Sequence, residues 1–260
     1  MAIFSFLSAV APSCSRATQK GLTLAGSTSV QPFAEKWADA YHVGHSNIPI
    51  HVQGGGSTAG VQAALSGAAQ IGMSSRSLSP KETGKIKGIV VARDGIAIIV
   101  HPTLRVDDLE LAQVRAIYSG TLENWQSLAG RDSPITVITR EEGSGTRGAF
   151  EELVMGGQRI AASALVQDST GTVRQMVASD PAAVGYVSIG LVDATVKALR
   201  LNGTEATEAN IDAKKYPLVR PFLFVVPREP AASAKDFIDW IVGPEGRELT
   251  RREGLLPPGT

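Results

Sequence analysis

Three short turns in the sequence combine glycine with serine and threonine, and a helix is predicted directly after each of them. They lie at residues 26–29 (Gly-Ser-Thr-Ser), 54–58 (Gly-Gly-Gly-Ser-Thr) and 143–146 (Gly-Ser-Gly-Thr). Glycine lets the backbone approach a ligand closely, and hydroxyl groups donate hydrogen bonds. The first N–H groups of a helix have no partner within it, and the helix dipole adds partial positive charge there. Such turns attract phosphate-like anions without a lysine, so together they predict a site for one small tetrahedral anion.

A positive charge stands beside the third turn. Arg140 follows a predicted strand at 135–139 and could add a guanidinium with forked donors to the anion site. A serine or threonine at one helix start is usually only a cap, so the prediction depends on the three turns acting jointly. The hydroxyl residues that we expect to surround the anion are Ser27, Thr28, Ser29, Ser57, Thr58, Ser144 and Thr146.

The elements that position these turns alternate between strands and helices. We expect strands at 22–25, 48–52, 70–73, 95–100, 135–139, 184–187, 196–201 and 223–226, and helices at 33–41, 59–65, 108–118, 173–178 and 236–241, with a further helix after residue 146. This alternation indicates an α/β protein with a mainly parallel sheet. In such sheets ligands bind beyond the carboxyl ends of the strands, which is where the turns lie.

Composition excludes several classes of function. The chain of 260 residues carries 25 Lys and Arg against 25 Asp and Glu, so it lacks the positive surplus of a nucleic-acid binder. A single cysteine rules out an internal disulfide and a multi-cysteine zinc site. No metal site is predicted from the four histidines, and no cofactor is expected.

Catalysis has little support in the sequence. Ser144 has no histidine base linked to it by a motif, and the turn at 143–146 is not a nucleophile elbow. We therefore expect binding without turnover. The alternative function is that of an NADP-binding Rossmann-type oxidoreductase, because Gly54-x-Gly56-x-x-Ala59 fits the dinucleotide fingerprint and Arg76 could read a ribose 2′-phosphate.

The first 20 residues suggest a leader. Residues 1–15 are uncharged and mostly apolar but too short to span a bilayer, as in the hydrophobic part of a secretion signal. Cys14 loosely matches a lipoprotein cleavage site and is a candidate for lipidation. Residues 1–20 are thus a signal or lipoprotein leader, or else an ordinary disordered N-terminus, and the first interpretation predicts an extracytoplasmic location.

Long stretches of the chain resemble the phosphate-binding proteins that deliver inorganic phosphate to bacterial ABC importers. The matching segments are GSTSVQPFAEKWA (26–38), GGGSTAGVQAALSG (54–67), IGMSSRSLSPKE (71–82), VVARDGIAIIVHP (90–102), LAQVRAIYSGTLENW (111–125), TREEGSGTRGAFEEL (139–153), AVGYVSIG (183–190) and YPLVRP (216–221). The resemblance implies a two-lobed type II periplasmic-binding-protein ("Venus flytrap") fold with phosphate between the lobes. It implies lobe 1 at 21–97 and 221–260, lobe 2 at 98–220, a monomer, and permease subunits as partners.

The resemblance also assigns roles to individual residues. It implies anion contacts from Thr28, Ser29, Ser57, Thr58, Ser75, Arg76, Arg140, Ser144, Gly145 and Thr146, and it makes Glu142 the carboxylate that orients Arg140. Some members carry an aspartate where this chain has Ser75, and that carboxylate accepts the proton of hydrogen phosphate. Its absence leaves sulfate or another tetrahedral oxyanion open as the ligand. Arg76 either contacts the anion or pairs with a neighbouring carboxylate.

Overall fold

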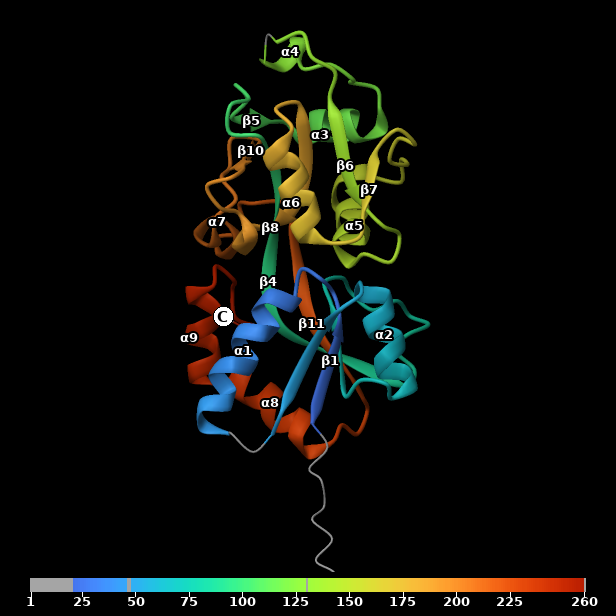
Figure 1. The fold of residues 1–260 in the computed structure, drawn as a ribbon, viewed down its shortest axis with the longest axis vertical. Helices are drawn as coiled ribbons and strands as arrows, with labels where there is room; N and C mark the ends of the chain where they lie inside the picture. The colour runs from blue at the N-terminus through green and yellow to red at the C-terminus, as the bar shows by residue number, and fades with distance from the viewer. Residues whose placement is uncertain (1–20, 46–47, 130, 260) are drawn as a thin grey trace, which may run out of the picture.

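The computed structural model describes residues 21–45, 48–129 and 131–259. The molecule has two lobes, one above the other, which two long strands connect (Figure 1). Both ends of the described chain lie in lobe 1, at the bottom of this view, and the middle of the chain forms lobe 2. The predicted leader at 1–20 and the candidate lipidation site Cys14 lie outside the described residues.

Lobe 1 is built on a sheet whose parallel strands carry two of the three predicted turns. Strand β1 lies between β2 and β3 and runs parallel to both, with Leu24 opposite Val52 on one side and Ile71 on the other. The elements of this lobe are β1 (Leu22–Gly26), α1 (Gln31–Gly44), β2 (Ile50–Gly54), α2 (Ser57–Ser66), β3 (Ile71–Ser74), α8 (Ala232–Val242) and α9 (Pro244–Arg252).

Lobe 2 repeats the arrangement around a second parallel group. Strand β6 pairs in parallel with β8 on one side and with β7 on the other. The elements of this lobe are β5 (Asp108–Leu109), α3 (Leu111–Ser119), α4 (Gln126–Ala129), β6 (Thr136–Arg140), α5 (Gly145–Phe150), the π-helical turn η1 (Glu151–Met155), β7 (Leu165–Gln167), α6 (Thr170–Ser179), β8 (Ala183–Ser188), the 3₁₀ turn η2 (Ile189–Leu191), β9 (Lys197–Ala198), β10 (Arg200–Leu201) and α7 (Glu208–Asp212).

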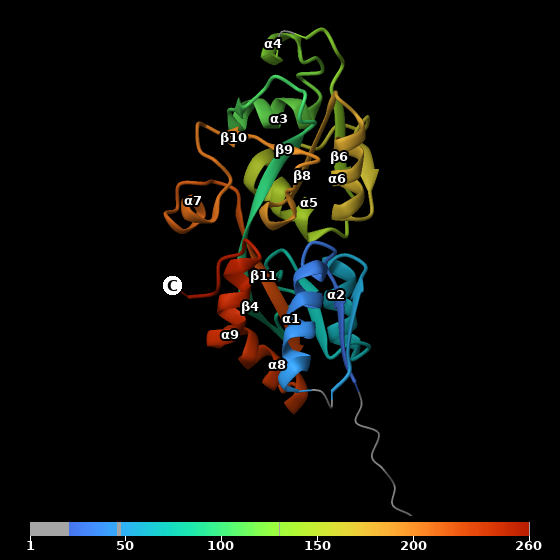
Figure 2. The same cartoon turned by 60° about the vertical axis from the view of Figure 1, so that its left-hand side comes forward.

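Two antiparallel strands, β4 (Ile86–Val100) and β11 (Val219–Pro227), join the lobes (Figure 2). Strand β4 pairs with β11 up to Gly95 and with β8 from Ile96 onward, so it belongs to both halves of the sheet. The predicted strand at 95–100 is therefore only the second part of a longer one. The predicted lobe boundaries, at 97/98 and 220/221, remain a prediction, and this change of partner lies two residues before the first of them.

Separate apolar cores hold each lobe together. In lobe 1, Phe33, Trp37 and Tyr41 follow one face of α1 and are buried, as their spacing of four residues predicts. Trp37 packs edge-on against Phe224 of β11, with ring centroids 5.9 Å apart. Burying one such side chain contributes about 1.5–3 kcal/mol. The helix is therefore fixed to the sheet, and its N-terminus is held at the junction of the lobes.

Among the described residues, no helix combines the length and apolar character required for a membrane span. The longest described helix is α1, with 14 residues.

Candidate anion-binding site

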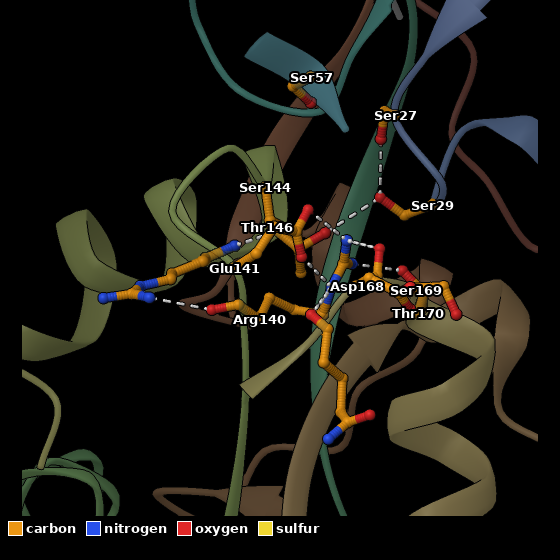
Figure 3. A network of polar contacts seen from close by, with 12 residues as sticks. Ser27, Ser29, Ser57, Arg140, Glu141, Ser144, Thr146, Asp168, Ser169 and Thr170 are labelled. Carbon is orange, nitrogen blue, oxygen red and sulfur yellow. Dashed lines mark hydrogen bonds and ion pairs between the residues drawn. The ribbon is translucent and has the colours of Figure 1, made fainter. Parts of the chain in front are cut away.

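The three predicted turns meet where the lobes face each other (Figure 3). The turn after β1 leads into α1, and the turn after β2 leads into α2; both come from lobe 1. The turn after β6 leads into α5 of lobe 2. Because β1 and β2 are parallel neighbours, their carboxyl ends lie at the same edge of the sheet. Three helix N-termini are thus directed toward one region.

A cluster of buried hydroxyl groups occupies this region. Ser29 Oγ lies 3.0 Å from Thr146 Oγ1 of the other lobe, a contact drawn in Figure 3. Ser75 Oγ is at the centre, 2.9 Å from Ser27 Oγ, 3.2 Å from Ser29 Oγ and 3.3 Å from Ser57 Oγ. We call these five residues the hydroxyl cluster: Ser27, Ser29, Ser57, Ser75 and Thr146, each no more than 2% exposed.

The backbones of the two lobes also touch at this point. Thr58 N–H donates to the carbonyl of Gly143, at 3.1 Å, across the lobes. A Cβ atom on Gly145 would overlap the Ser57 hydroxyl and would lie 2.7 Å from Ser75 Oγ. A residue with a side chain at position 145 would therefore force the lobes apart. Glycine is required there by the close approach.

The hydroxyl groups of Thr28 and Ser144, both predicted to contact the anion, differ in their hydrogen bonds. Thr28 Oγ1 is buried and makes no hydrogen bond to any described residue, which is costly unless a ligand or water satisfies it. Ser144 Oγ accepts a hydrogen bond from Arg147 N–H, at 3.3 Å, and so caps α5. Thr28 is free to donate to an anion, whereas the Ser144 hydroxyl also has a structural role.

Arg140 ends β6 and is 1% exposed. Its Nε donates to Glu141 and to the carbonyl of Gln167, and its Nη2 donates to Glu141 and to the carbonyl of Asp168. Nη1 donates to Thr170 Oγ1, at 2.9 Å. A guanidinium has five N–H groups, so one N–H on Nη1 has no acceptor among the described residues. The side chain is held firmly and retains one donor for a ligand.

The carboxylate that bonds Arg140 in this structure is Glu141, not the predicted Glu142. Both oxygens of Glu141 face the guanidinium, at 3.0 Å from Nε and 3.0 Å from Nη2 (Figure 3). Glu142 instead lines a separate surface pocket with Arg147 and Glu151. The physical reason is the direction of the turn: the Glu141 N–H bonds the carbonyl of Gln167, which fixes its side chain on the Arg140 side.

Arg76 makes an ion pair at the edge of the site. Its two amino groups bind both oxygens of Glu82, at 3.0 and 2.9 Å. The hydrogen bond from Arg76 lowers the pKa of Glu82 from 4.5 to about 2. Arg76 Nη2 also lies 3.5 Å from the hydroxyl of Thr58, which is on the exposed part of its turn. Of the two roles considered for Arg76, the ion pair with a neighbouring carboxylate is the one observed.

Several residues of the site were not predicted. Thr170 starts α6 after β7, within a Ser-Thr-Gly-Thr sequence at 169–172 that is a fourth turn of the same composition, so the sequence held a signal for it. Tyr186 lies behind Arg140: its hydroxyl is 2.8 Å from Thr139 Oγ1 and accepts from Arg140 N–H at 3.3 Å. Burial raises the pKa of Tyr186 to about 12, so this phenol stays neutral at physiological pH.

A buried ion pair between Asp94 and Arg220 was also missed. It lies on the two strands that cross between the lobes, where the two residues are paired in register. Nothing in the local sequence indicates it, because the partners are 126 positions apart.

The Rossmann alternative finds no support in this arrangement. The fingerprint glycines follow β2, which is at one end of the strand order rather than at its centre. Arg76, the predicted reader of a 2′-phosphate, is engaged by Glu82. Within the described parts of the chain, no group of three or more His, Cys, Asp and Glu side chains is placed to hold a metal ion.

Comparisons with known proteins agree with the geometry. A PBP superfamily domain matches residues 11–245. The phosphate-binding protein PstS of Bacillus subtilis is 31% identical over 241 residues, which are 91% of this chain and 80% of that protein. The PstS of Borreliella burgdorferi is 24% identical over 92% of this chain and 90% of its own length.

Solved structures of phosphate transport proteins are also similar to this chain. A Clostridium perfringens protein assigned as the substrate-binding component of a phosphate ABC transporter, solved with bound phosphate, superposes with a TM-score of 0.89 at 38% identity. The alignment covers 92% of this chain and all of that one. An ABC-type phosphate transport receptor from Vibrio cholerae gives 0.75 at 36% identity, over 91% of this chain and all of its own. The chain therefore belongs to the PBP superfamily and, within it, to the family of the phosphate-binding protein PstS.

Proposed function

We propose that this protein binds inorganic phosphate between its two lobes and delivers it to the permease subunits of an ABC-type importer. The observation that carries this function is the meeting of hydroxyl groups from both lobes beside one buried arginine with an unused donor. The relatives named above are phosphate-binding proteins and a transport receptor, which supports the same ligand and the same partner.

The chemistry of the site suits an oxyanion. The donors are hydroxyl groups, helix N-terminal N–H groups and the free N–H of Arg140, all of which can surround a tetrahedral ion. We propose anion contacts from Thr28, Ser29, Ser57, Ser75, Arg140, Ser144, Gly145 and Thr146, with Thr58 and Arg76 at the rim. The ion would replace hydroxyl–hydroxyl bonds by charge-assisted bonds, each contributing about 1.5–3 kcal/mol when formed.

The sum of these bonds exceeds any real affinity, because desolvation of the anion and closure of the lobes oppose them. A net free energy of about −8 kcal/mol corresponds to micromolar binding. This is the weakest affinity that we expect of a scavenging protein.

The second candidate ligand is sulfate, because the residue at the centre of the hydroxyl cluster is uncharged. Ser75 is the central member of the hydroxyl cluster, and a serine carries no charge. A carboxylate at that position would accept the proton of hydrogen phosphate and would repel sulfate, which brings no proton. We therefore propose weaker discrimination against sulfate than in members with an aspartate there.

The remaining proposals concern the cellular setting. We propose that the protein binds without turnover, acts as a monomer and works outside the cytoplasm. Residues 1–20 would be its leader, with Cys14 as the lipidation site if the leader is of the lipoprotein type.

A thermal-shift screen with phosphate, sulfate, molybdate and NADPH tests the function. A ligand that binds only the folded state raises its stability by mass action, by about 2.7 kcal/mol at a hundredfold excess over Kd. Phosphate should raise the melting temperature and NADPH should not. A shift with NADPH alone would contradict the proposed function.

A further inference from the structure

The Asp94–Arg220 pair is the most deeply buried ion pair in the described chain. The two side chains are 0% and 1% exposed. Arg220 Nε donates to Asp94 Oδ2 at 2.9 Å, and Asp94 Oδ1 accepts from the Ser188 hydroxyl at 2.6 Å. Burying two charges is expensive and is only partly repaid by their attraction. Apolar side chains of similar volume would stabilise this core as well as the ion pair does, which points to a role other than stability.

Arg220 has one amino group without a partner in the described chain. Its Nη2 pairs with Asp94 Oδ2 at 2.9 Å, whereas Nη1 is buried and makes no hydrogen bond to any described residue. Thr28 Oγ1 is likewise buried without a hydrogen-bond partner among the described residues, and it belongs to the proposed phosphate site. Buried donors without acceptors are uncommon in native proteins, which suggests that a ligand or its water shell completes them.

Contacts in each lobe link Arg220 to residues beside the anion site. On the lobe 2 side, Ser188, which donates to Asp94, is two residues after Tyr186, which bonds Arg140. On the lobe 1 side, the Arg220 guanidinium lies 5.2 Å from the centre of the Phe222 ring, and Phe222 packs against Phe33 of α1.

The pairing of β11 with β3 also places Arg220 near the strand that leads to Ser75. Strand β11 pairs with β3, where Leu223 is opposite Ser74, the residue before Ser75. Arg220 is three residues earlier on β11, on the way to lobe 2. It therefore lies on the part of β11 between the crossing from lobe 2 and the register position of Ser74, the residue before Ser75.

The pKa of Arg220 responds to the charge of Arg140 as well as to that of Asp94. Burial lowers the pKa of Arg220, and the charge of Arg140 acts in the same direction, while Asp94 opposes both. An anion bound near both arginines would relieve this repulsion. Glu141 already offsets the charge of Arg140, so the unpaired Nη1 of Arg220 would add to the positive potential of the helix N-termini.

Resting on the proposed function, we propose that Arg220 supplies the second positive charge to the bound phosphate and that Asp94 is the positioning residue that holds it there. Asp94 holds the guanidinium at Nε and Nη2, and Ser188 holds the Asp94 carboxylate in turn. Nη1, which has no acceptor among the described residues, is then the positive end of a fixed dipole.

The test uses a variant that removes both charges together, Asp94→Asn with Arg220→Met, because removing one partner alone leaves a buried charge and destabilises the fold. Arg220→Lys keeps the positive charge. The matched control removes an ion pair of lobe 2 remote from the site, Lys197→Met with Asp107→Asn. Phosphate Kd is measured by calorimetry at about pH 5 and about pH 8, where phosphate is mainly a monoanion and mainly a dianion.

We expect the Asp94/Arg220 double variant to bind the dianion at least about tenfold more weakly, the scale of one lost charge-assisted bond, and to lose less for the monoanion. Arg220→Lys should retain most of the affinity, and the Lys197/Asp107 control all of it. A role in packing alone would weaken both ionic forms equally.

Two results would overturn the inference while leaving the proposed function intact. One is a double variant that binds phosphate with the wild-type Kd at both pH values, while Arg140→Ala still weakens phosphate binding. The other is an equal loss for Arg220→Lys and the double variant, which would exclude a role of charge. A wild-type protein that does not bind phosphate would instead contradict the proposed function itself.

Discussion

The hydroxyl of Ser29 in lobe 1 lies 3.0 Å from the hydroxyl of Thr146 in lobe 2, although the residues are 117 positions apart. Each stands at the N-terminus of a helix of its own lobe. Two halves of one anion site are therefore brought together by the relative position of the lobes. Any change that separates the lobes should weaken binding without disturbing either core.

Gly145→Ala is expected to produce such a separation. The added methyl group would overlap the Ser57 hydroxyl across the junction, so phosphate affinity should fall by about 3 kcal/mol, the upper end of the range for overpacking. Gly148→Ala is the matched control on the same helix, since its Cβ would meet Arg76 Cδ at an ordinary 3.5 Å. Calorimetry on both variants checks this. Equal affinities for the two would show that the close approach is not needed for binding.

Glu141→Gln should loosen Arg140, whereas Glu142→Gln should not. Glu141 accepts from both Nε and Nη2, and a neutral amide can accept only at its single oxygen. We expect phosphate affinity to fall by about 1–2 kcal/mol for Glu141→Gln, because hydrogen bonds to charged groups are stronger than neutral ones. Titration of both variants with phosphate shows which of the two carboxylates orients Arg140. A larger loss for Glu142→Gln would restore the interpretation made from the sequence.

Ser75→Asp should raise the preference for phosphate over sulfate. A carboxylate in the centre of the hydroxyl cluster accepts the phosphate proton and repels sulfate, and like charges in contact cost several kcal/mol. We expect the ratio of the two Kd values to change by at least about tenfold. Ser77→Asp adds the same charge at an exposed position two residues away and is the control. Ratios that are equal in Ser75→Asp and the wild type would place the selectivity elsewhere.

The Arg76–Glu82 pair predicts a stability that depends on pH. Because the pKa of Glu82 is lowered from 4.5 to about 2, the folded state favours the carboxylate more than the unfolded state does. The contribution is complete above pH 4.5 and is lost as the pH falls toward 2. Since the pair is partly exposed, we expect about 1 kcal/mol at neutral pH.

Urea unfolding of the wild type and Glu82→Gln measures this contribution. The difference between their free energies of unfolding should shrink between about pH 7 and about pH 3. Glu229→Gln, at an exposed position, serves as the control. A difference that stays constant over this range would exclude the ion pair as its source.

The parts of the site that the sequence predicted are those encoded locally. A strand followed by glycine and hydroxyl residues and then by a helix is visible in a single segment, and three such segments, at 26–29, 54–58 and 143–146, do converge. The central position of Ser75 in the hydroxyl cluster was not visible in this way. It depends on the pairing of β3 with both β1 and β11.

The parts that could not be predicted depend on direction and on distant pairing. Glu141 and Glu142 are chemically identical neighbours, and only the backbone bond from Glu141 to Gln167 decides which of them faces Arg140. The first part of β4 was missed because exposed and charged residues interrupt its apolar pattern. With that strand missed, nothing indicated that Asp94 would face Arg220.

The most direct test of the central claim is a calorimetric titration of phosphate into the wild type and Arg140→Ala. The wild type should bind with micromolar affinity or better, about −8 kcal/mol or more favourable. Arg140→Ala should lose at least about 3 kcal/mol, because it removes one partner of a buried charged group. Arg200→Ala, an exposed arginine of the same lobe, should change nothing. Wild-type affinity in Arg140→Ala would contradict the assignment of the anion site to the junction of the lobes beside Arg140.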